Sequence, residues 1–297
     1  MKRVITAAVL IPLVLLAVFL APNWLFTVLV GAVALLATVE YLTLAAGYGN
    51  EPFRFITYLL MATFYGIVVW ATGYPSPSGE YVLLAMIFFF TLAPFVYLCV
   101  AMARKDMRSV LPGVAISYVA LSYIGFSLSC LIYLRIMVTG WFLILFTFLV
   151  IWVGDTAAYY VGRSVGRTKF APRISPKKTW EGAIASGVAA IVVGILLVEF
   201  APQISRGLAK IHLLRAPDLF ESTPLWMTAL VALGINIAGQ IGDLLESLIK
   251  RGANVKDSGS MLPGHGGILD RIDALLFAAP VALLLFGGLR EYFVRLP

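Results

Sequence analysis

Ionisable residues crowd into one short stretch of a chain that is otherwise apolar. Residues 247–273 read SLIKRGANVKDSGSMLPGHGGILDRID, whereas the 297-residue chain is 61% hydrophobic and only 12% charged. Charge inside a membrane is expensive, at about 3 kcal/mol per residue or more. Basic residues and carboxylates beside a glycine-rich turn are groups that bind phosphates and metal ions. The stretch therefore predicts a polyphosphate and metal site at a membrane surface.

A stripe of polar residues leads into this stretch. Its members recur at helical spacing and are Asp243, Glu246, Ser247 and Lys250. Residues three and four apart share one face of a helix, so the stripe should face the protein interior or a water-filled cavity. We expect Asp243 to bind a hard cation and Lys250 to contact a phosphate. The alternative is a salt-bridged helix end, because Glu246 and Lys250 form a favourable pair.

A second carboxylate pair, Asp270 and Asp273, begins the last apolar segment directly after Gly266 and Gly267. Glycines let backbone N–H groups approach an anion at a helix N-terminus. Mg²⁺ takes oxygen ligands and is often held by one or two carboxylates plus substrate phosphates. We therefore expect Asp243 and Asp270 to hold Mg²⁺, with a second cation left open. The alternative is that the pair only favours the helix dipole in the first turn.

His265 lies in the same glycine loop. It could transfer a proton, contact a phosphate or hydrogen-bond the loop into shape, and these alternatives stay open. The chain has no GxSxG, Walker A, HExxH or CxxC motif. A hydrolase triad, P-loop chemistry and a zinc site are therefore unsupported.

Residues 152–182 form a second polar cluster. Its candidate binding residues are Asp155, Tyr159, Ser175, Lys177, Lys178 and Glu181. A Ser-Pro pair before two lysines is typical of an ordered turn. We expect Lys177 and Lys178 to hold a phosphate headgroup, with Glu181 pairing with one of them or orienting it. The alternative is a basic anchor at the membrane surface. Both clusters adjoin the same ends of apolar segments, so they could converge on one site.

These motifs resemble the signature of the phosphatidate cytidylyltransferase family. The match runs through Ser247-x-Ile249-Lys250-Arg251, Lys256-Asp257, Gly259, Leu262-Pro263 and His265-Gly266-Gly267-Ile268-x-Asp270-Arg271-Ile272-Asp273. Residues 155–159 (DTAAY) and 175–182 (SPKKTWEG) resemble a second block of that family, and Gly242-Asp243 also fits. With the multi-span layout, the resemblance covers effectively the whole chain.

The resemblance implies an enzyme that condenses CTP with phosphatidic acid, giving CDP-diacylglycerol and pyrophosphate. The lipid phosphate attacks the α-phosphorus of CTP, so positioning and charge neutralisation dominate and no protein nucleophile is needed. Asp243 and Asp270 become the expected metal ligands, supported by Asp273 and Glu246. The residues expected to be catalytic are Asp243, Lys250, His265, Asp270, Arg271 and Asp273. Those expected to bind substrate are Asp155, Tyr159, Ser175, Lys177, Lys178, Glu181, Ser247, Arg251, Lys256, Asp257, Gly266 and Gly267.

The elements that must position these residues are apolar helices. A mean hydropathy of +0.95 excludes an ordinary soluble chain, and a bilayer core about 30 Å thick needs roughly 20 apolar residues per helix. Such segments are predicted at 4–22, 25–47, 53–72, 81–102, 110–134, 141–162, 182–200, 224–246 and 270–289. We predict an all-α polytopic membrane bundle with about nine transmembrane helices. Residues 1–108 should form a scaffold and residues 109–297 a catalytic region with cytoplasmic loops 163–181 and 247–270.

The basic loops predict the orientation of the chain. With a cytoplasmic N-terminus, most lysines and arginines, including those of both clusters, fall on the cytoplasmic face. We expect an integral protein of the bacterial inner membrane whose active site faces the cytoplasm. The net charge of +7 suits anionic lipids and acidic ligands. The expected partners are CTP, phosphatidic acid and the bilayer; nucleic acid is not expected, and a homodimer is left open.

Other function classes fit the pattern less well. A secondary transporter should show paired repeats and broken helices in two halves, and none is evident. A CDP-alcohol phosphotransferase should carry aspartates along DGxxAR-type helices, which this chain lacks. An enzyme that uses an ether-lipid phosphate could share the polar motif and is harder to exclude. In the first half, Glu40 is the one buried acid, and a lone carboxylate there should face the interior and find a partner.

Overall fold

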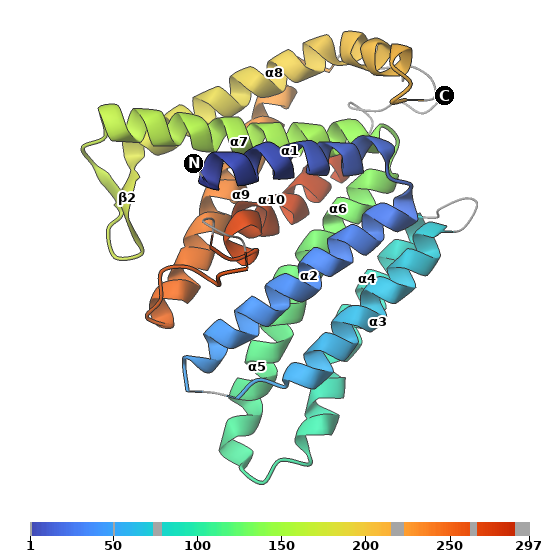
Figure 1. The fold of residues 1–297 in the computed structure, drawn as a ribbon, viewed down its shortest axis with the longest axis vertical. Coiled ribbons are helices and arrows are strands. Elements are labelled where there is room, and N and C mark those ends of the chain that lie inside the picture. The colour runs from blue at the N-terminus through green and yellow to red at the C-terminus, as the bar shows by residue number, and fades with distance from the viewer. Residues whose placement is uncertain (1, 50, 74–78, 215–222, 262–265, 289–297) are drawn as a thin grey trace.

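Helices build almost all of this structure, a computed structural model that describes residues 2–49, 51–73, 79–214, 223–261 and 266–288 (Figure 1). Side chains of the first helix are described from Ile11 onward. The helical elements are α1 (Lys2–Leu20), α2 (Asn23–Ala46), α3 (Arg54–Gly73), α4 (Gly79–Ala101), η1 (Met107–Ser109), α5 (Val110–Ala120), η2 (Leu121–Phe126), α6 (Ser127–Ile136), α7 (Gly140–Ser164), α8 (Trp180–Lys210), α9 (Leu225–Gly252) and α10 (Leu269–Gly288). The prediction of an all-α polytopic bundle is confirmed.

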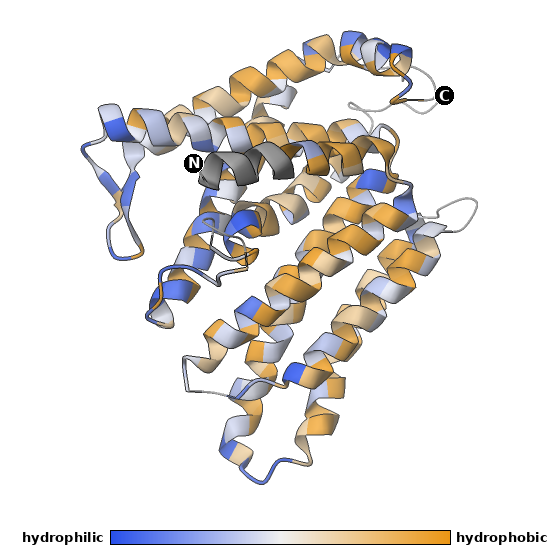
Figure 2. Ribbon diagram, viewed as in Figure 1, coloured by the Kyte–Doolittle hydropathy of each residue, from blue (hydrophilic) through white to orange (hydrophobic). Residues whose placement is uncertain are grey.

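Apolar residues make up most of the long helices, and hydrophilic residues concentrate toward their ends (Figure 2). Within the described ranges, seven helical stretches are long and apolar enough to cross a membrane. They are α2, α3, α4, the composite stretch Met107–Ile136, α7, α8 and α9. The first helix contributes the shorter apolar stretch Ile11–Leu20, and α10 is not among the seven. The chain is therefore an integral membrane protein, although the predicted number of nine spans is not confirmed.

Two predicted segments differ in detail from the structure. The span predicted at 110–134 is a composite of η1, α5, the π-helix η2 and α6. The span predicted at 182–200 continues as α8 through Pro202 to Lys210. Proline removes one helical hydrogen bond but does not forbid the helix from continuing when its neighbours re-satisfy the backbone. The residues after Pro202 are mostly good helix formers, so the helix extends beyond the predicted end at residue 200.

A short hairpin precedes α8 and is its rigid extension. Strands β1 (Lys169–Ala171) and β2 (Ser175–Thr179) pair antiparallel. The hydroxyl of Thr179 accepts the Gly182 N–H at 3.3 Å and so caps α8. The rings of Phe170 and Trp180 pack edge to face with centroids 4.5 Å apart. The segment around the predicted Ser-Pro turn is thus ordered as a strand.

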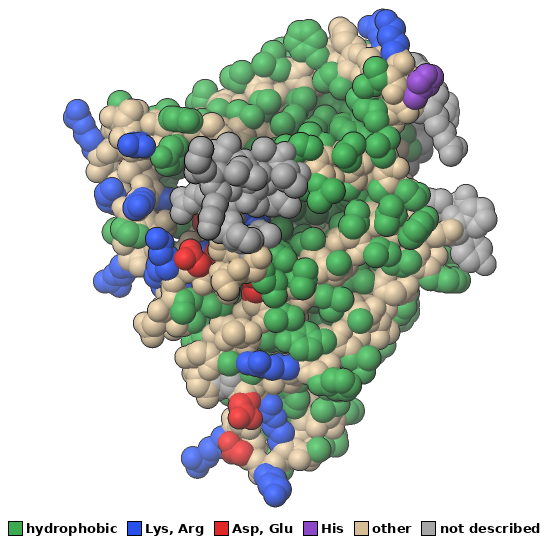
Figure 3. Space-filling model, viewed as in Figure 1, with side chains coloured by type: hydrophobic (Ala, Val, Ile, Leu, Met, Phe, Trp, Pro, Cys, Tyr) green, Lys and Arg blue, Asp and Glu red, His purple; other side chains and the backbone are tan. Residues whose placement is uncertain are grey.

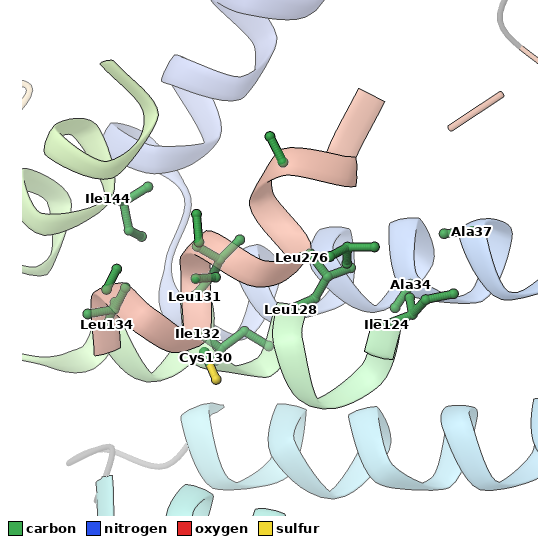
Figure 4. Close-up of a cluster of buried hydrophobic side chains, with 14 of the residues drawn as sticks. Ala34, Ala37, Ile124, Leu128, Cys130, Leu131, Ile132, Leu134, Ile144 and Leu276 are labelled. Carbon is green, nitrogen blue, oxygen red and sulfur yellow. The ribbon is translucent and has the colours of Figure 1, made fainter. Parts of the chain in front are cut away.

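The core has α6 at its centre (Figure 4). Leu128 and Leu131 of α6 are buried with Ala34 of α2, Ile144 of α7 and Leu276 of α10. Within a membrane such contacts are stabilised by close packing rather than by exclusion of water. Helix α6 therefore holds α2, from the N-terminal region, against α10. We call the segment between α9 and α10, residues 253–268, the polar loop.

A buried polar network joins α7, α8 and α9 deeper in the bundle. The side-chain amide of Asn236 donates to the Ser186 hydroxyl at 3.0 Å, and that of Gln240 donates to Asn236 Oδ1 at 2.7 Å. Gln240 also donates to the Ala183 carbonyl at 3.3 Å. A Cβ at Gly154 would lie 2.8 Å from Ser186 Oγ and would also collide with the Asn236 amide. Because the network needs this close approach, Gly154 has no room for a side chain.

Candidate active site

The two polar clusters meet where the hairpin contacts α9. Lys178 Nζ lies 2.7 Å from Asp243 Oδ2 and donates to the Gln240 carbonyl at 3.3 Å. Arg251 makes a second link, with its Nε donating to the Ile174 carbonyl at 3.4 Å. We call the contact between Lys178 and Asp243 the hairpin junction. It confirms that the clusters converge, although their residues are far apart in sequence.

A second ion cluster joins the end of α9 to the start of α10. Lys250 Nζ lies 2.5 Å from Asp270 Oδ1 and also forms an ion pair with Glu246, one helical turn earlier. The side chains of Lys250, Glu246 and Asp270 are 10%, 0% and 6% exposed. We call this trio the loop junction. Both carboxylates already pair with the lysine, so the salt-bridged helix end considered from the sequence is present.

The other oxygen of Asp270 closes the loop onto α10. Asp270 Oδ2 accepts hydrogen bonds from Ser258 N at 2.9 Å and Gly267 N at 2.8 Å, and Ser258 Oγ lies 2.9 Å from the same oxygen. Gly266 has φ of +77°, and a Cβ there would lie 2.6 Å from the same oxygen. Glycine is required at 266 on both counts. Backbone N–H groups at this helix start therefore serve the protein's own carboxylate.

A group of carboxylates surrounds the hairpin junction. Asp155 and Asp273 both lie within electrostatic range of Asp243, and Asp155 is also in range of Lys178. Asp273 Oδ1 accepts the N–H of Ala274 at 2.7 Å. Across the described part of the chain, no group of three or more acidic, histidine or cysteine side chains forms a ready metal site.

The donor chemistry around Asp243 nevertheless fits a hard cation. The carboxylate oxygens of Asp155, Asp243 and Asp273 are the ligand type that Mg²⁺ takes, and together they carry more negative charge than Lys178 balances. By contrast, both oxygens of Asp270 already accept protein donors. Asp270 would have to give up one of these contacts to bind a metal.

Tyr123 is a residue that sequence reasoning missed. Its buried hydroxyl has no hydrogen-bond partner among the residues that the structure describes. It lies within electrostatic range of Asp273 and Glu246, and it belongs to the π-helix η2. Such π turns occur frequently at functional sites. Nothing in the apolar span around it distinguishes this tyrosine from a core aromatic residue.

The remaining predicted residues contact a junction, hold the hairpin or are exposed. Tyr159 accepts a hydrogen bond from Arg163 at 3.1 Å, and Ser247 donates to Asp243 at 3.4 Å. Glu181 accepts the backbone N–H of Thr168 at 3.0 Å, so it anchors the hairpin; no ion pair joins it to Lys177 or Lys178 in the described structure. Ser175 begins β2. The exposed candidates are Asp155, Tyr159, Lys177, Arg251, Lys256, Asp257 and Arg271.

Basic side chains gather over the hairpin end of the molecule (Figure 3). Exposed members of this group are Arg163, Arg167, Lys169, Arg173 and Lys177. They precede or belong to the hairpin that carries Lys178, and their charges favour an anionic ligand or surface. His265, the remaining catalytic candidate, lies outside the described residues.

Comparison with known proteins identifies relatives of the chain. A family model described as the cytidylyltransferase family matches residues 1–288. A Haemophilus influenzae protein named phosphatidate cytidylyltransferase is 30% identical over 291 residues, which are 94% of this chain and 96% of that protein. A Staphylococcus haemolyticus protein of the same name is 33% identical over 211 residues, covering 71% of this chain and 73% of that protein.

A relative with higher identity matches over a shorter region. The Brucella suis protein, also named phosphatidate cytidylyltransferase, is 44% identical over 170 residues. That match covers 57% of this chain and 56% of the relative. The chain therefore spans little more than half the length of this relative at that level of identity.

Proposed function

This chain belongs to the cytidylyltransferase family, and we propose that it transfers CMP from CTP to phosphatidic acid. The products are pyrophosphate and CDP-diacylglycerol, and the CDP-diacylglycerol serves phospholipid synthesis. The names of its relatives from Haemophilus influenzae and Brucella suis support this choice of substrates. The observation that carries the proposal is the hairpin junction, which brings a lysine of one polar cluster onto a carboxylate of the other.

The chemistry needs no nucleophile from the protein. A phosphate oxygen of phosphatidic acid forms a bond to the α-phosphorus of CTP, and the bond from that phosphorus to the bridging oxygen of the β-phosphate breaks. Pyrophosphate leaves with the electron pair of that bond. Transfers of this kind are accelerated by positioning and by neutralising phosphate charge. A membrane site with many basic residues and buried, paired carboxylates meets both needs.

We assign the direct phosphate contacts to the exposed basic residues. Lys178 is 26% exposed and can exchange Asp243 for a phosphate oxygen with little loss of energy. Further exposed basic residues that can hold the triphosphate and the lipid phosphate are Lys177, Arg251, Lys256 and Arg271. Lys250, enclosed by two carboxylates, acts instead by holding α9 and α10 together.

We propose Mg²⁺ as the metal, with Asp243 as a ligand and Oδ2 of Asp270 as a second ligand once that oxygen releases one of its protein donors, while Oδ1 stays on Lys250. When bound, Mg²⁺ would neutralise phosphate charge and polarise phosphate oxygens. Asp155 and Asp273 are further oxygen donors near Asp243. These residues bind and orient, while the basic side chains hold the anionic substrates.

The activity is tested with radiolabelled CTP and the purified full-length chain in mixed micelles with phosphatidic acid. We expect labelled CDP-diacylglycerol and pyrophosphate in equal amounts with Mg²⁺, and no product after EDTA treatment. An ether-linked phosphatidic acid run in parallel decides between acceptors. A preparation that retains its folded state but makes no labelled lipid from phosphatidic acid would contradict the proposal.

We further propose that the site faces the cytoplasm of a bacterial inner membrane. The support is the gathering of basic residues at the hairpin end, as expected for a cytoplasmic face. An Arg173→Cys variant in a Cys99→Ser background should react with a membrane-impermeant maleimide in inverted vesicles and stay unreacted in intact cells. The opposite pattern would overturn the orientation. A homodimer stays a prediction, and light scattering of the detergent-solubilised protein tests it.

A further inference from the structure

Glu40 reaches the polar loop from the other end of the chain. This residue of α2 is 3% exposed, and its carboxylate lies within hydrogen-bond distance of three donor groups. Glu40 Oε1 accepts Ile268 N at 3.0 Å and Oε2 accepts Leu269 N at 2.9 Å, while Ser258 Oγ lies 3.0 Å from Oε2 and shares its one proton between Glu40 and Asp270. The two N–H groups belong to the start of α10, where the helix has no internal acceptors for them. A carboxylate there is also stabilised by the positive end of the helix dipole.

Two glycines of the polar loop owe their identity to Glu40. A Cβ at Gly259 would lie 2.5 Å from Glu40 Oε1. A Cβ at Gly267 would collide with both Glu40 Oε2 and Ser258 Oγ. The loop therefore wraps closely around this side chain. These glycines make room for a carboxylate of the protein, whereas the sequence pattern suggested that Gly267 makes room for a ligand.

The same helix also contacts the other border of the loop. Tyr48, just beyond the end of α2, donates its hydroxyl to the Ile249 carbonyl of α9 at 2.6 Å. A Cβ at Gly252 would collide with that hydroxyl. Partial burial raises the pKa of Tyr48, which keeps the hydroxyl in its donating form. The end of α2 thus contacts both helices that border the loop.

Glu40 is connected to the loop junction through one hydroxyl. Ser258 Oγ lies 3.0 Å from Glu40 Oε2 and 2.9 Å from Asp270 Oδ2. It also accepts the Asp270 N–H at 3.3 Å. Asp270 in turn holds Lys250 through its other oxygen. A displacement of Glu40 would therefore be passed to Asp270 and Lys250 by direct contacts.

We propose that Glu40 is a positioning residue, which fixes the loop between α9 and α10 and thereby the placement of Asp270 and Lys250. Residues 1–108, expected to be a scaffold, would then supply part of the geometry required for CMP transfer. The effect on turnover rests on the proposed function. The effect on the loop rests on the hydrogen bonds of Glu40 alone, and so can be tested separately.

The test compares Glu40→Gln with Thr38→Val in the full-length chain. Thr38 is a matched control because it is also buried on the same helix, and its hydroxyl donates to the Ala34 carbonyl within α2. Hydrogen exchange followed by mass spectrometry reports on the amides of Ile268 and Leu269. In Glu40→Gln we expect their exchange to accelerate at least about tenfold, since two strong acceptors are weakened.

Turnover of CTP provides the second readout. Glu40→Gln should lower kcat by about tenfold to a hundredfold, because small misplacements of catalytic groups have effects of this size. The KM for phosphatidic acid should change by less than about twofold, which a lost substrate contact would not permit. Thr38→Val should match the unaltered protein in both readouts. A Glu40→Asp variant that restores kcat and the protection of the Ile268 and Leu269 amides from exchange would support a requirement for the carboxylate.

Each outcome decides a separate point. Unchanged exchange at residues 267–270 in Glu40→Gln overturns the inference, whatever the activity. Accelerated exchange with normal kcat overturns the role in positioning. If the unaltered protein shows no CTP-dependent product, the proposed function fails while the exchange result still decides the loop contact. Should Glu40→Gln not fold, Ser258→Ala carries the test, and normal exchange and kcat in that folded variant would refute the inference.

Discussion

Two ion clusters lie at the junctions between polar segments, and they differ in how much water reaches them. At the hairpin junction the side chains of Lys178 and Asp243 are 26% and 39% exposed. At the loop junction those of Lys250 and Asp270 are 10% and 6% exposed. An exposed ion pair contributes about 0–1 kcal/mol, whereas removing one partner of a buried pair destabilises a protein by about 3–5 kcal/mol. The first contact can therefore open for a substrate, and the second has to stay closed.

The difference in exposure separates two roles, ligand binding and stabilisation of the fold, which the sequence pattern did not distinguish. Lysines and aspartates of both clusters looked equally suited to phosphate and metal binding. The more exposed contact leaves its charges available to a ligand, while the charges of the enclosed trio pair with one another and stabilise the fold. The following changes are ranked from the largest expected effect to the smallest, and each bears on this difference.

Replacing Lys250 with methionine should have the largest effect on stability. The change leaves Glu246 and Asp270 buried without their cation, so we expect the free energy of unfolding to fall by about 3–5 kcal/mol. Denaturant titration of the detergent-solubilised protein measures this loss. The exposed Lys177→Met is the matched control and should stay within about 0.5 kcal/mol of the unaltered protein. Equal stability of the two variants would remove the distinction between the junctions.

Replacing Asp243 with asparagine should affect turnover far more than stability. Loss of a charged group that acts on the phosphates should reduce the rate of CDP-diacylglycerol formation by about a hundredfold or more. The half-exposed ion pair contributes little, so unfolding should shift by no more than about 1 kcal/mol. Initial rates with saturating CTP and Mg²⁺, together with unfolding curves, check both parts. Near-normal turnover would take Asp243 out of the site.

Replacing Tyr123 with phenylalanine should stabilise the ligand-free protein. A buried hydroxyl without a partner is unfavourable by about 1–3 kcal/mol, and the substitution removes it. Tyr118→Phe is the control of opposite sign, because the Tyr118 hydroxyl donates to the Phe90 carbonyl at 3.1 Å. Its loss should destabilise the protein by about 1 kcal/mol. If Tyr123→Phe also destabilises the protein, the Tyr123 hydroxyl has a hydrogen-bond partner in the folded state.

A double-mutant cycle on the hairpin junction should give the smallest effect. Lys178→Met and Asp243→Asn, alone and together, isolate the coupling between the two side chains. We expect a coupling of about 0.2–1 kcal/mol in the free energy of unfolding. A coupling above about 2 kcal/mol would mean that this pair, like the buried trio, is part of the framework.

The helices could be predicted from the sequence, because the length of an apolar run is set directly by the thickness of the bilayer. Helix α2, predicted at 25–47, runs from Asn23 to Ala46. The continuation of α8 past Pro202 was missed because proline and charged residues are typical of helix ends. The π-helix η2 was missed because no residue pattern distinguishes it from a regular turn.

The site could be predicted only where its geometry is local. The Glu246–Lys250 pair follows from helical spacing within α9. The partners of Glu40 lie 218 to 229 residues away in sequence, and only the packing of α2 against the loop brings them together. For the same reason the sequence left open whether Lys250 contacts a phosphate or a carboxylate. Contacts between side chains of different helices depend on how the helices pack, and a single sequence does not reveal this packing.

The buried polar network between α8 and α9 fixes how far one helix is shifted along the other. That shift decides where Lys178 of the hairpin meets Asp243 of α9. Asn236 precedes Asp243 by two turns of α9, about 10 Å along the axis, and Ser186 lies two turns into α8. Sliding one helix along the other would break these buried hydrogen bonds where no water can replace them. Lys178 and Asp243 are therefore aligned from within the membrane. A substitution such as Gly154→Ala would misalign them without touching either residue.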